Sequence, residues 1–166
     1  MGISSHDFLQ HVIQPTLRQL GVHSCGAEQL LLATANFQSG LGLHLQFNDA
    51  IGVYGITEQQ HCEVWDCYLA FDPDLASQIR GMASQHEFPK APHLELATNL
   101  SYATAIAWMI YRYRNVKIPD VFNGQDLADC WQNCFREQAG TEKDAADFVC
   151  SYNELMKVHT ATRLAA

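Results

Sequence analysis

The feature that most constrains the fold is an apolar run from Leu30 to Phe37 that ends in Gln-Ser and two glycines. The run leaves almost no polar face, which predicts a helix buried in the protein core. Gly40 and Gly42 predict a tight turn directly after it, because glycine easily adopts the left-handed conformation that ends many helices. Gln38 therefore stands where a buried helix meets a loop, a favourable position for a side chain that takes part in chemistry.

Helical spacing of apolar residues and well-placed capping residues predict about seven helices in one mainly α domain. One long helix is expected over residues 94–114, and Gly140 is expected to end the helix that carries Trp131. We expect the packed core to span about residues 5–157 of a single domain, 1–166, with residues 158–166 as a tail without pattern. The predicted helices begin at or near Ser5, Ser24, Thr57, Asp72, Leu94, Leu127 and Thr141.

The pattern of the sequence changes after the second predicted helix. Leu43, Leu45 and Phe47 alternate with polar residues, which is typical of a half-exposed strand. The Asn-Asp pair at 48–49 then offers a turn, and residues 50–56 are rich in β-branched and aromatic side chains. We therefore predict a short, irregular β-hairpin or extended loop directly after the second helix.

Charge and apolar content exclude several classes of protein. Of the 166 residues, 48% are hydrophobic and 17% are charged, which is typical of a globular domain and not of a disordered chain. A net charge of -8 leaves no basic stripe for phosphates, so we expect no nucleic-acid partner. The longest apolar run, Ala103 to Tyr111, is shorter than the ~20 residues of a membrane helix, so we expect no membrane partner. No signal peptide is visible, so we expect synthesis in the cytoplasm.

The six cysteines are expected to be free thiols, because no secretion signal directs the chain to an oxidising compartment. A zinc site is imaginable where Cys62 and Cys67 meet Cys130 and Cys134, with His61 as a further ligand. These spacings do not match the short Cys-x-x-Cys knuckles of structural zinc sites. We therefore expect no metal and no cofactor, and we interpret the cysteines as small core residues.

Two short motifs resemble those of lytic transglycosylases and goose-type lysozymes. Residues 38–40, Gln-Ser-Gly, resemble the Glu-Ser-Gly that ends the catalytic helix of these enzymes, and residues 52–56, Gly-Val-Tyr-Gly-Ile, are similar to a segment that lines their cleft. Residues 99–103 fall where such enzymes begin a later cleft-lining helix. The order of elements from Val12 to about Tyr152 also resembles this family, and especially the lysozyme-like proteins of tailed bacteriophages. The resemblance implies a lysozyme-like α+β fold.

The resemblance also implies a site at the end of the buried helix, with Gln38 in the place of the catalytic acid. Cleavage of a glycosidic bond needs a proton for the leaving oxygen while positive charge builds on the sugar ring. A glutamic acid provides that proton, whereas glutamine keeps the shape and the hydrogen bonding but has no proton to donate. General-acid catalysis is worth about 10²–10⁴-fold, so this replacement is expected to remove most activity. The implied substrate contacts are Ser39, Tyr54, Gly55, Asn99 and Tyr102.

Gln38 is either an engineered replacement for glutamate or native to the chain. We favour a native change, because Gly55 stands where the family has a glutamine and Thr57 stands where an acidic residue is common. Asp49 or Glu58 could also take over from the missing acid. Both residues also have an ordinary structural explanation: Asp49 is typical of a turn, and Glu58 is favourable at a helix N-terminus.

Three functions follow from the resemblance. The leading one is a phage-derived, lysozyme-like protein of the virion or tail that has lost peptidoglycan cleavage and serves as a structural or glycan-binding component. Its partners are then phage structural proteins or the glycan of peptidoglycan, and its location is the virion. The first alternative is an active muramidase or lytic transglycosylase in which Gln38 was engineered, or is bypassed by Asp49 or Glu58. The second is a catalytically silent glycan binder with a groove around Gln38, Tyr54 and Tyr102.

Overall fold

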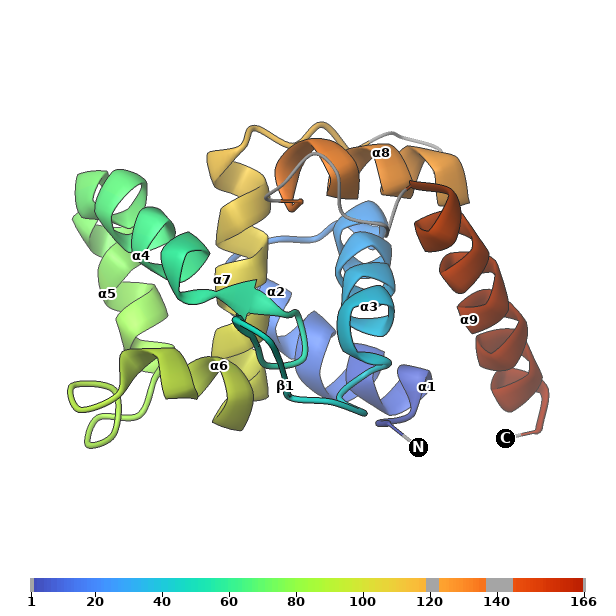
Figure 1. Cartoon of the computed structure of the whole chain (residues 1–166), viewed down its shortest axis with the longest axis horizontal. Helices are drawn as coiled ribbons and strands as arrows, with labels where there is room; N and C mark the ends of the chain where they lie inside the picture. The colour runs from blue at the N-terminus through green and yellow to red at the C-terminus, as the bar shows by residue number, and fades with distance from the viewer. Residues whose placement is uncertain (1, 119–122, 137–144, 166) are drawn as a thin grey trace.

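The computed structural model describes residues 2–118, 123–136 and 145–165. Helices make up most of these residues, and a small antiparallel sheet follows α3 (Figure 1). The prediction of a mainly α fold with a short β excursion is confirmed. The elements are α1 Ser5–Phe8, η1 Leu9–Ile13, α2 Gln14–Gln19, α3 Cys25–Ser39, β1 Gln46–Phe47, β2 Ala50–Ile51, β3 Ile56–Thr57, α4 Glu58–Cys67, η2 Leu69–Phe71, α5 Pro73–Met82, η3 Pro92–Leu94, α6 Glu95–Thr98, α7 Leu100–Tyr113, α8 Gly124–Cys134 and α9 Ala145–Ala165.

Local sequence features account for the start of several helices. Ser24 caps α3, because its hydroxyl accepts a hydrogen bond from the backbone N–H of Ala27 at 3.2 Å. Thr57 and Gln60 form a reciprocal capping box at the start of α4, with both hydrogen bonds at 3.1 Å. Asp72 caps α5 in the same way as Ser24 caps α3. These three helices begin where the sequence predicts.

The first three elements, α1, η1 and α2, form one N-terminal helix with a π-helical turn in the middle. The turn comes directly before Pro15, which has no N–H to donate to the preceding turn of the helix. Gly21, at φ 71°, ends the helix in the left-handed conformation.

The helices α3 and α7 lie side by side in the middle of the molecule (Figure 1). Every residue from Tyr102 to Tyr111 is buried, so α7 has almost no polar face. The Thr34 hydroxyl on α3 donates to the Leu30 carbonyl at 2.7 Å, and the Tyr111 hydroxyl therefore donates to Thr34, also at 2.7 Å. Burial raises the pKa of Tyr111 well above its ordinary value. Among the described residues, no helix is both long and apolar enough to cross a membrane.

The long helix expected over residues 94–114 is broken at Asn99, which separates α6 from α7. Asn99 has an extended backbone, with φ -125° and ψ 97°, and its side-chain oxygen accepts from the N–H of Tyr102 at 3.0 Å. Its side-chain nitrogen donates to the Met82 carbonyl at 2.9 Å. The apolar spacing continues through Asn99, so the sequence pattern predicts one unbroken helix. The break depends on the contact of Asn99 with Met82 at the end of α5, which the pattern cannot show.

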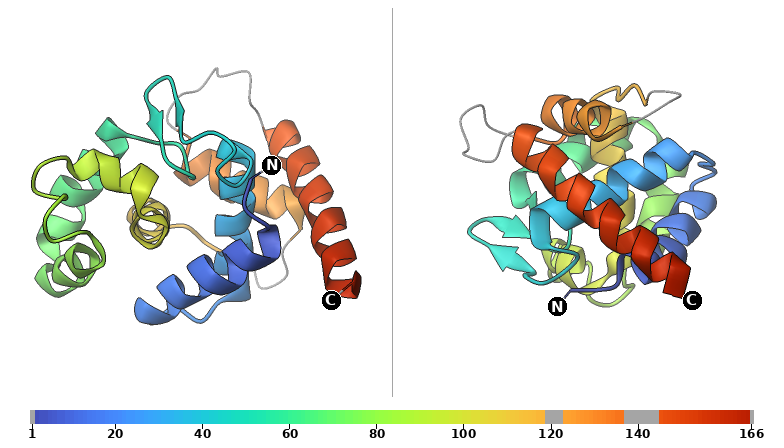
Figure 2. Two further views of the ribbon diagram at one scale, coloured as in Figure 1. Left: turned by 90° about the horizontal axis from the view of Figure 1, so that it is seen from below. Right: turned by 90° about the vertical axis from the view of Figure 1, so that its right-hand side faces the viewer.

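The sheet has the strand order β1-β2-β3, and both neighbouring pairs are antiparallel. Asn48, at φ 54°, makes the turn between β1 and β2, which confirms the predicted hairpin. The third strand pairs with β2 and leads directly into α4. Figure 2 shows that the hairpin stands away from the helical body.

Phe37, Trp131 and Phe148 join the C-terminal helices to α3. The rings of Trp131 on α8 and Phe148 on α9 stack with centroids 5.4 Å apart, and Phe37 on α3 lies 5.0 Å and 5.2 Å from them. Pairs at these separations stabilise a core beyond the area that they bury. The three rings therefore fix the outer helices to α3, which carries Gln38 in its last turn.

Two expectations for the C-terminal helices differ from the structure. α8 ends at Cys134, and the expected boundary at residues 140–141 lies outside the described residues. α9 continues to Ala165, through the segment that was expected to be a tail. His159 in this segment is buried, and its Nδ1 lies 3.2 Å from the Ser5 hydroxyl. The last turns of α9 carry no apolar stripe, and this contact between the two ends of the chain holds them in place.

Candidate functional site

The end of α3 positions Gln38 beside the hairpin. Gly40 and Gly42 have φ 61° and 83°, and the N–H of Gly40 donates to the Asn36 carbonyl at 2.8 Å. The helix therefore stops in a left-handed cap, as the two glycines predict. Gln38 is half-buried in the last turn of this helix.

Ser39 fastens the helix end to the hairpin. Its hydroxyl lies 2.7 Å from the carbonyl oxygen of Val53 and 3.2 Å from that of Ala35, and it accepts from the N–H of Gly42 at 2.9 Å. The side chain is buried, so all of its hydrogen-bonding capacity serves the protein itself. Ser39 therefore positions its neighbours, and its hydroxyl is not free to meet a ligand.

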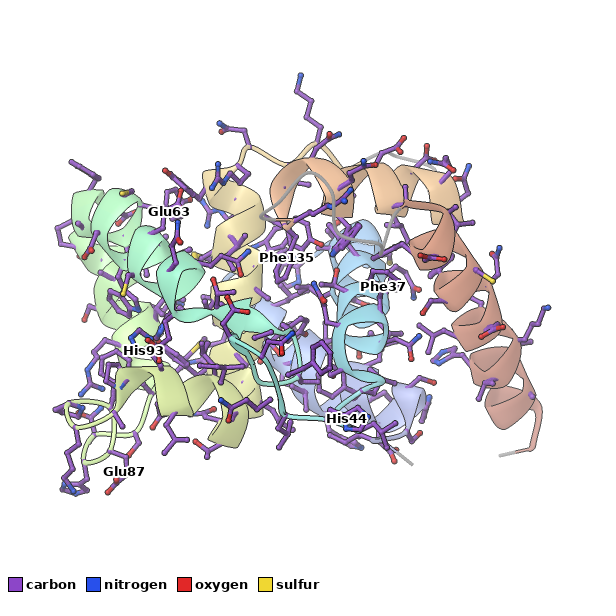
Figure 3. All side chains as sticks on the ribbon, in the orientation of Figure 1. Phe37, His44, Glu63, Glu87, His93 and Phe135 are labelled. Atoms are coloured by element: carbon purple, nitrogen blue, oxygen red, sulfur yellow. The ribbon has the colours of Figure 1, made fainter. Side chains whose placement is uncertain are left out.

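A cavity of about 190 Å³ lies between the end of α3 and the hairpin. Gly55, at φ +57°, forms part of its wall, and a Cβ atom there would lie only 3.4 Å from Cβ of Gln38. The Gln38 side chain therefore lies directly against Gly55. The resemblance sets this glycine at the position where lysozyme-like enzymes have a glutamine. His44 lies near the end of α3 (Figure 3). The lining comprises Gln38, Ser39, His44, Gln46, Phe47 and Ala50, together with Gly52 and Gly55.

No carboxylate is among the described residues that line this cavity. Asp49 is exposed in the turn between β1 and β2, and Glu58 is exposed at the first position of α4. Both therefore hold the structural positions that their sequence context suggests. The described lining offers two side-chain amides, one imidazole and one aromatic ring, and no carboxylic acid.

Tyr54 and Tyr102 differ from the expectation that they line a groove. Both rings are fully buried, so neither presents a face to a sugar. The Thr104 hydroxyl donates to the Leu100 carbonyl at 2.7 Å, so the Tyr54 hydroxyl donates to Thr104 at 3.1 Å. Burial raises the pKa of both tyrosines well above the ordinary value. Spacing alone could not separate a core tyrosine from a cleft tyrosine, because the sequence around each of them is mostly apolar.

Asn99 lies at a different cavity, of about 660 Å³, beside the start of α7. The buried carboxylate of Glu95 also lines it, and Oε2 of Glu95 accepts from the N–H of Ser84 at 3.2 Å and from the Asn99 amide at 3.0 Å. The structure therefore brings Gln38, Ser39 and Gly55 together and leaves Asn99 at a separate position. Gly52 belongs to the wall of the first cavity and packs on the backbone of Leu96, next to Glu95.

Gln46 and Phe47 are lining residues that the sequence did not single out. Phe47 is 70% exposed although it is a large apolar side chain. The alternation that predicts the strand indicated that one face of residues 43–47 would be apolar, but it could not show that this face borders Gln38. That proximity depends on the Ser39–Val53 hydrogen bond, which joins elements that are separate in sequence.

The cysteines are not the small core residues that the sequence suggested. Two are half-buried on α8, where the Cys130 thiol lies 3.5 Å from the Lys117 carbonyl, and burial raises the pKa of both Cys130 and Cys134. Within the described ranges, no group of three or more His, Cys, Asp or Glu side chains is arranged to hold a metal ion. The exposed cysteines are Cys25, Cys62, Cys67 and Cys150.

Comparisons with known protein families, with characterised proteins and with solved structures find no match to this chain. The resemblance to lysozyme-like enzymes therefore rests on the two short motifs and on the order of elements. The site itself is defined by its geometry: a small cavity at the end of a buried helix, with Gln38 in its wall and no acid among its described lining.

Proposed function

We propose that the chain is a lysozyme-like protein that binds a glycan at the Gln38 cavity without cleaving it. The observation that carries the proposal is the cavity at the end of α3, whose described lining contains a glutamine and no carboxylic acid. Glycosidic cleavage by the two-carboxylate mechanism needs an acid within hydrogen-bonding reach of the leaving oxygen. Asp49 and Glu58 are exposed and are not among the residues that line the cavity, so a bypass through them has no support.

The character of the lining supports a sugar as the ligand. Gln38 and Gln46 can each donate and accept hydrogen bonds, as sugar hydroxyls and acetamido groups require. Phe47 offers an exposed ring on which the apolar face of a sugar can pack. The absence of charged groups from the described lining favours a neutral ligand.

We further propose that the protein works as a component of a phage virion or tail, with phage structural proteins as neighbours. This setting rests on the resemblance, because phage tails often carry lysozyme-like domains close to the cell wall. Mass spectrometry of purified particles tests it. The protein should be present in stoichiometric amounts, and its absence from the particles would rule out the structural role.

Calorimetric titration with chitooligosaccharides and with muropeptides tests glycan binding directly. We expect saturable heat with at least one of these glycans, and a complete lack of heat with both would refute the binding proposal. Phe47→Ala should weaken binding about fivefold, which corresponds to a loss of about 1 kcal/mol of contact. Phe71→Ala is the matched control, because Phe71 is 82% exposed in η2 and does not line the cavity. An equal effect of the two variants would contradict the proposed location.

A further inference from the structure

Two histidines from separate elements face each other at the contact between α4 and η3. Nδ1 of His61 lies 2.8 Å from Nδ1 of His93, and Nε2 of His61 lies 2.7 Å from the Tyr102 hydroxyl. The indole N–H of Trp65 lies 3.0 Å from the same hydroxyl and 3.3 Å from His61 Nε2. His61 is only 1% exposed, whereas His93 is half-buried. The cluster thus runs from the buried α7 toward the surface.

The donors in this cluster assign the hydrogen positions. An indole N–H can only donate, so the atoms that Trp65 faces, the Tyr102 oxygen and His61 Nε2, both accept. The Tyr102 hydroxyl then donates to His61 Nε2, and the hydrogen of neutral His61 is on Nδ1. His61 Nδ1–H donates to His93 Nδ1, so the hydrogen of neutral His93 is on Nε2.

This arrangement leaves no ring nitrogen that can take up a proton without loss of a hydrogen bond. A proton on His93 Nδ1 would face the N–H of His61 across 2.8 Å. A proton on His61 Nε2 would face the hydroxyl of Tyr102 and the N–H of Trp65. Burial, with a smaller contribution from His93, lowers the pKa of His61 to about 4. The closed cluster therefore favours a neutral His61.

His93 belongs to residues 84–94, which we call the strap. The strap touches the same cluster a second time through Phe88, whose ring centroid lies 5.9 Å from Trp65 and 5.7 Å from Tyr102. The guanidinium of Arg80 lies 4.5 Å from the centroid of Phe88 on another side. Four residues of the strap also line the 660 Å³ cavity: Ser84, Glu87, Ala91 and Leu94. The strap is therefore a wall of this cavity. It is held by the contacts of Phe88 with Trp65, Tyr102 and Arg80, by the histidine pair, and by the hydrogen bond from the Ser84 N–H to Glu95.

Five further titratable groups lie around the cluster or in the strap. Arg80 on α5 is close enough to lower the pKa of Tyr102, and Glu95 on α6 is close enough to raise it. Within the strap, Glu87 pairs with Lys90 at 3.3 Å, and His86 is exposed. Glu95 is already engaged by two hydrogen-bond donors. Among the described residues, neither His61 nor His93 forms an ion pair with a carboxylate.

We propose that the His61–His93 contact is a proton-operated latch, in which protonation of the pair releases the strap from α4 and α7 and opens the 660 Å³ cavity. Release separates His93 from His61 and gives His61 access to water. A histidine in water takes up a proton at its ordinary pKa of 6.5, so acid favours the open state. The latch is independent of the Gln38 cavity and of glycan binding.

Hydrogen–deuterium exchange of the full chain, read by mass spectrometry at pH 7.5 and pH 5, tests the latch. After correction for the intrinsic exchange rates, we expect strap amides to exchange up to about 30-fold faster at pH 5, because the open state then regains the ordinary pKa of His61. Amides of α3 and α7 should keep their protection. Unchanged exchange in the strap, or equal acceleration in α7, would overturn the proposal.

Two variants locate the effect. His61→Gln keeps an acceptor for Tyr102 and a donor for His93 but does not titrate, so acceleration of the strap between pH 7.5 and pH 5 should fall below about threefold. His86→Gln removes an exposed histidine from the same strap and should behave as the wild type. A full pH response in His61→Gln, or its loss in His86→Gln, would contradict the latch.

Nitrogen-15 NMR of the imidazole rings provides a measurement that needs no variant. At pH 7.5 the wild type should contain His61 with its hydrogen on Nδ1 and His93 with its hydrogen on Nε2. The opposite tautomer at His61, or a charged His61, would overturn the proposal even if His61→Gln failed to fold.

Discussion

The position of the hairpin, and with it the wall of the Gln38 cavity, depends on Gly52. A Cβ atom at this residue would overlap the carbonyl oxygen of Leu96 and lie 2.6 Å from its carbonyl carbon. Only glycine therefore lets the hairpin pack on the backbone of α6. Gly52 also has φ +77°, which other residues adopt at a cost of about 1–2 kcal/mol. Gly52→Ala is expected to incur both costs.

Gly21→Ala separates the two costs, because Gly21 has a similar φ of +71° but a Cβ atom there would have no neighbour within 4 Å. We expect a loss of about 1–2 kcal/mol in the free energy of unfolding for Gly21→Ala. For Gly52→Ala we expect about 2–5 kcal/mol, because forced overlap in a packed contact adds about 1–3 kcal/mol. Urea unfolding followed by circular dichroism measures both values.

The comparison between the two variants has a clear contrary outcome. Losses that agree within about 0.5 kcal/mol would show that the backbone of α6 yields freely and that Gly52 does not fix the hairpin. A loss of about 2–5 kcal/mol leaves a folded protein if the wild type is stable by more than about 6 kcal/mol, which lies within the usual range of about 5–15 kcal/mol. The cavity of Gly52→Ala can then be probed by the same glycan titration as the wild type.

Three further predictions concern stability. Between pH 6.5 and 4 the free energy of unfolding should fall by about 3 kcal/mol. The reason is that the unfolded chain protonates His61 at its ordinary pKa of 6.5, whereas the folded protein protonates it only near 4. Urea unfolding across this range should show a flatter pH profile for His61→Gln. Ser39→Ala should cost about 1–3 kcal/mol, because its buried partners lose their hydrogen bonds, whereas exposed Ser101→Ala should cost less than about 0.5 kcal/mol; equal losses would refute the fastening role. Thr104→Val should cost about 1–3 kcal/mol by leaving the Tyr54 hydroxyl without its acceptor, and adding Tyr54→Phe should recover most of that loss in thermal unfolding.

Sequence patterns predicted the features that arise from neighbouring residues. The Ser24 cap, the Thr57 capping box and the left-handed end of α3 at Gly40 all depend on contacts within a few positions. The break at Asn99 and the buried His159 depend on partners far along the chain, Met82 and Ser5 respectively. Apolar spacing has no means of detecting such polar contacts.

In the candidate site, too, features set by neighbouring residues were predicted and features set by distant partners were not. Gln38 and Gly55 meet at one cavity, as the motifs implied. Gln38 lies just before the turn at Gly40, and Gly55 lies in a turn of its own, and both turns require glycine. Tyr54 and Tyr102 point into the core, because their hydroxyls find acceptors on neighbouring helices. The contact of His61 with η3 joins residues 32 positions apart, and no local pattern in the sequence marks it.

We propose that the Gln38 site stands in the place of a catalytic acid but lacks the acid, so the protein should not cleave peptidoglycan. The turbidity of a purified peptidoglycan suspension, mixed with the folded wild-type protein, decides this point, with an active lysozyme as the positive control. We expect the turbidity to stay constant with this protein while the control clears the suspension. Clearing by the wild type would show that the chain cleaves the glycan and would refute the proposed loss of activity.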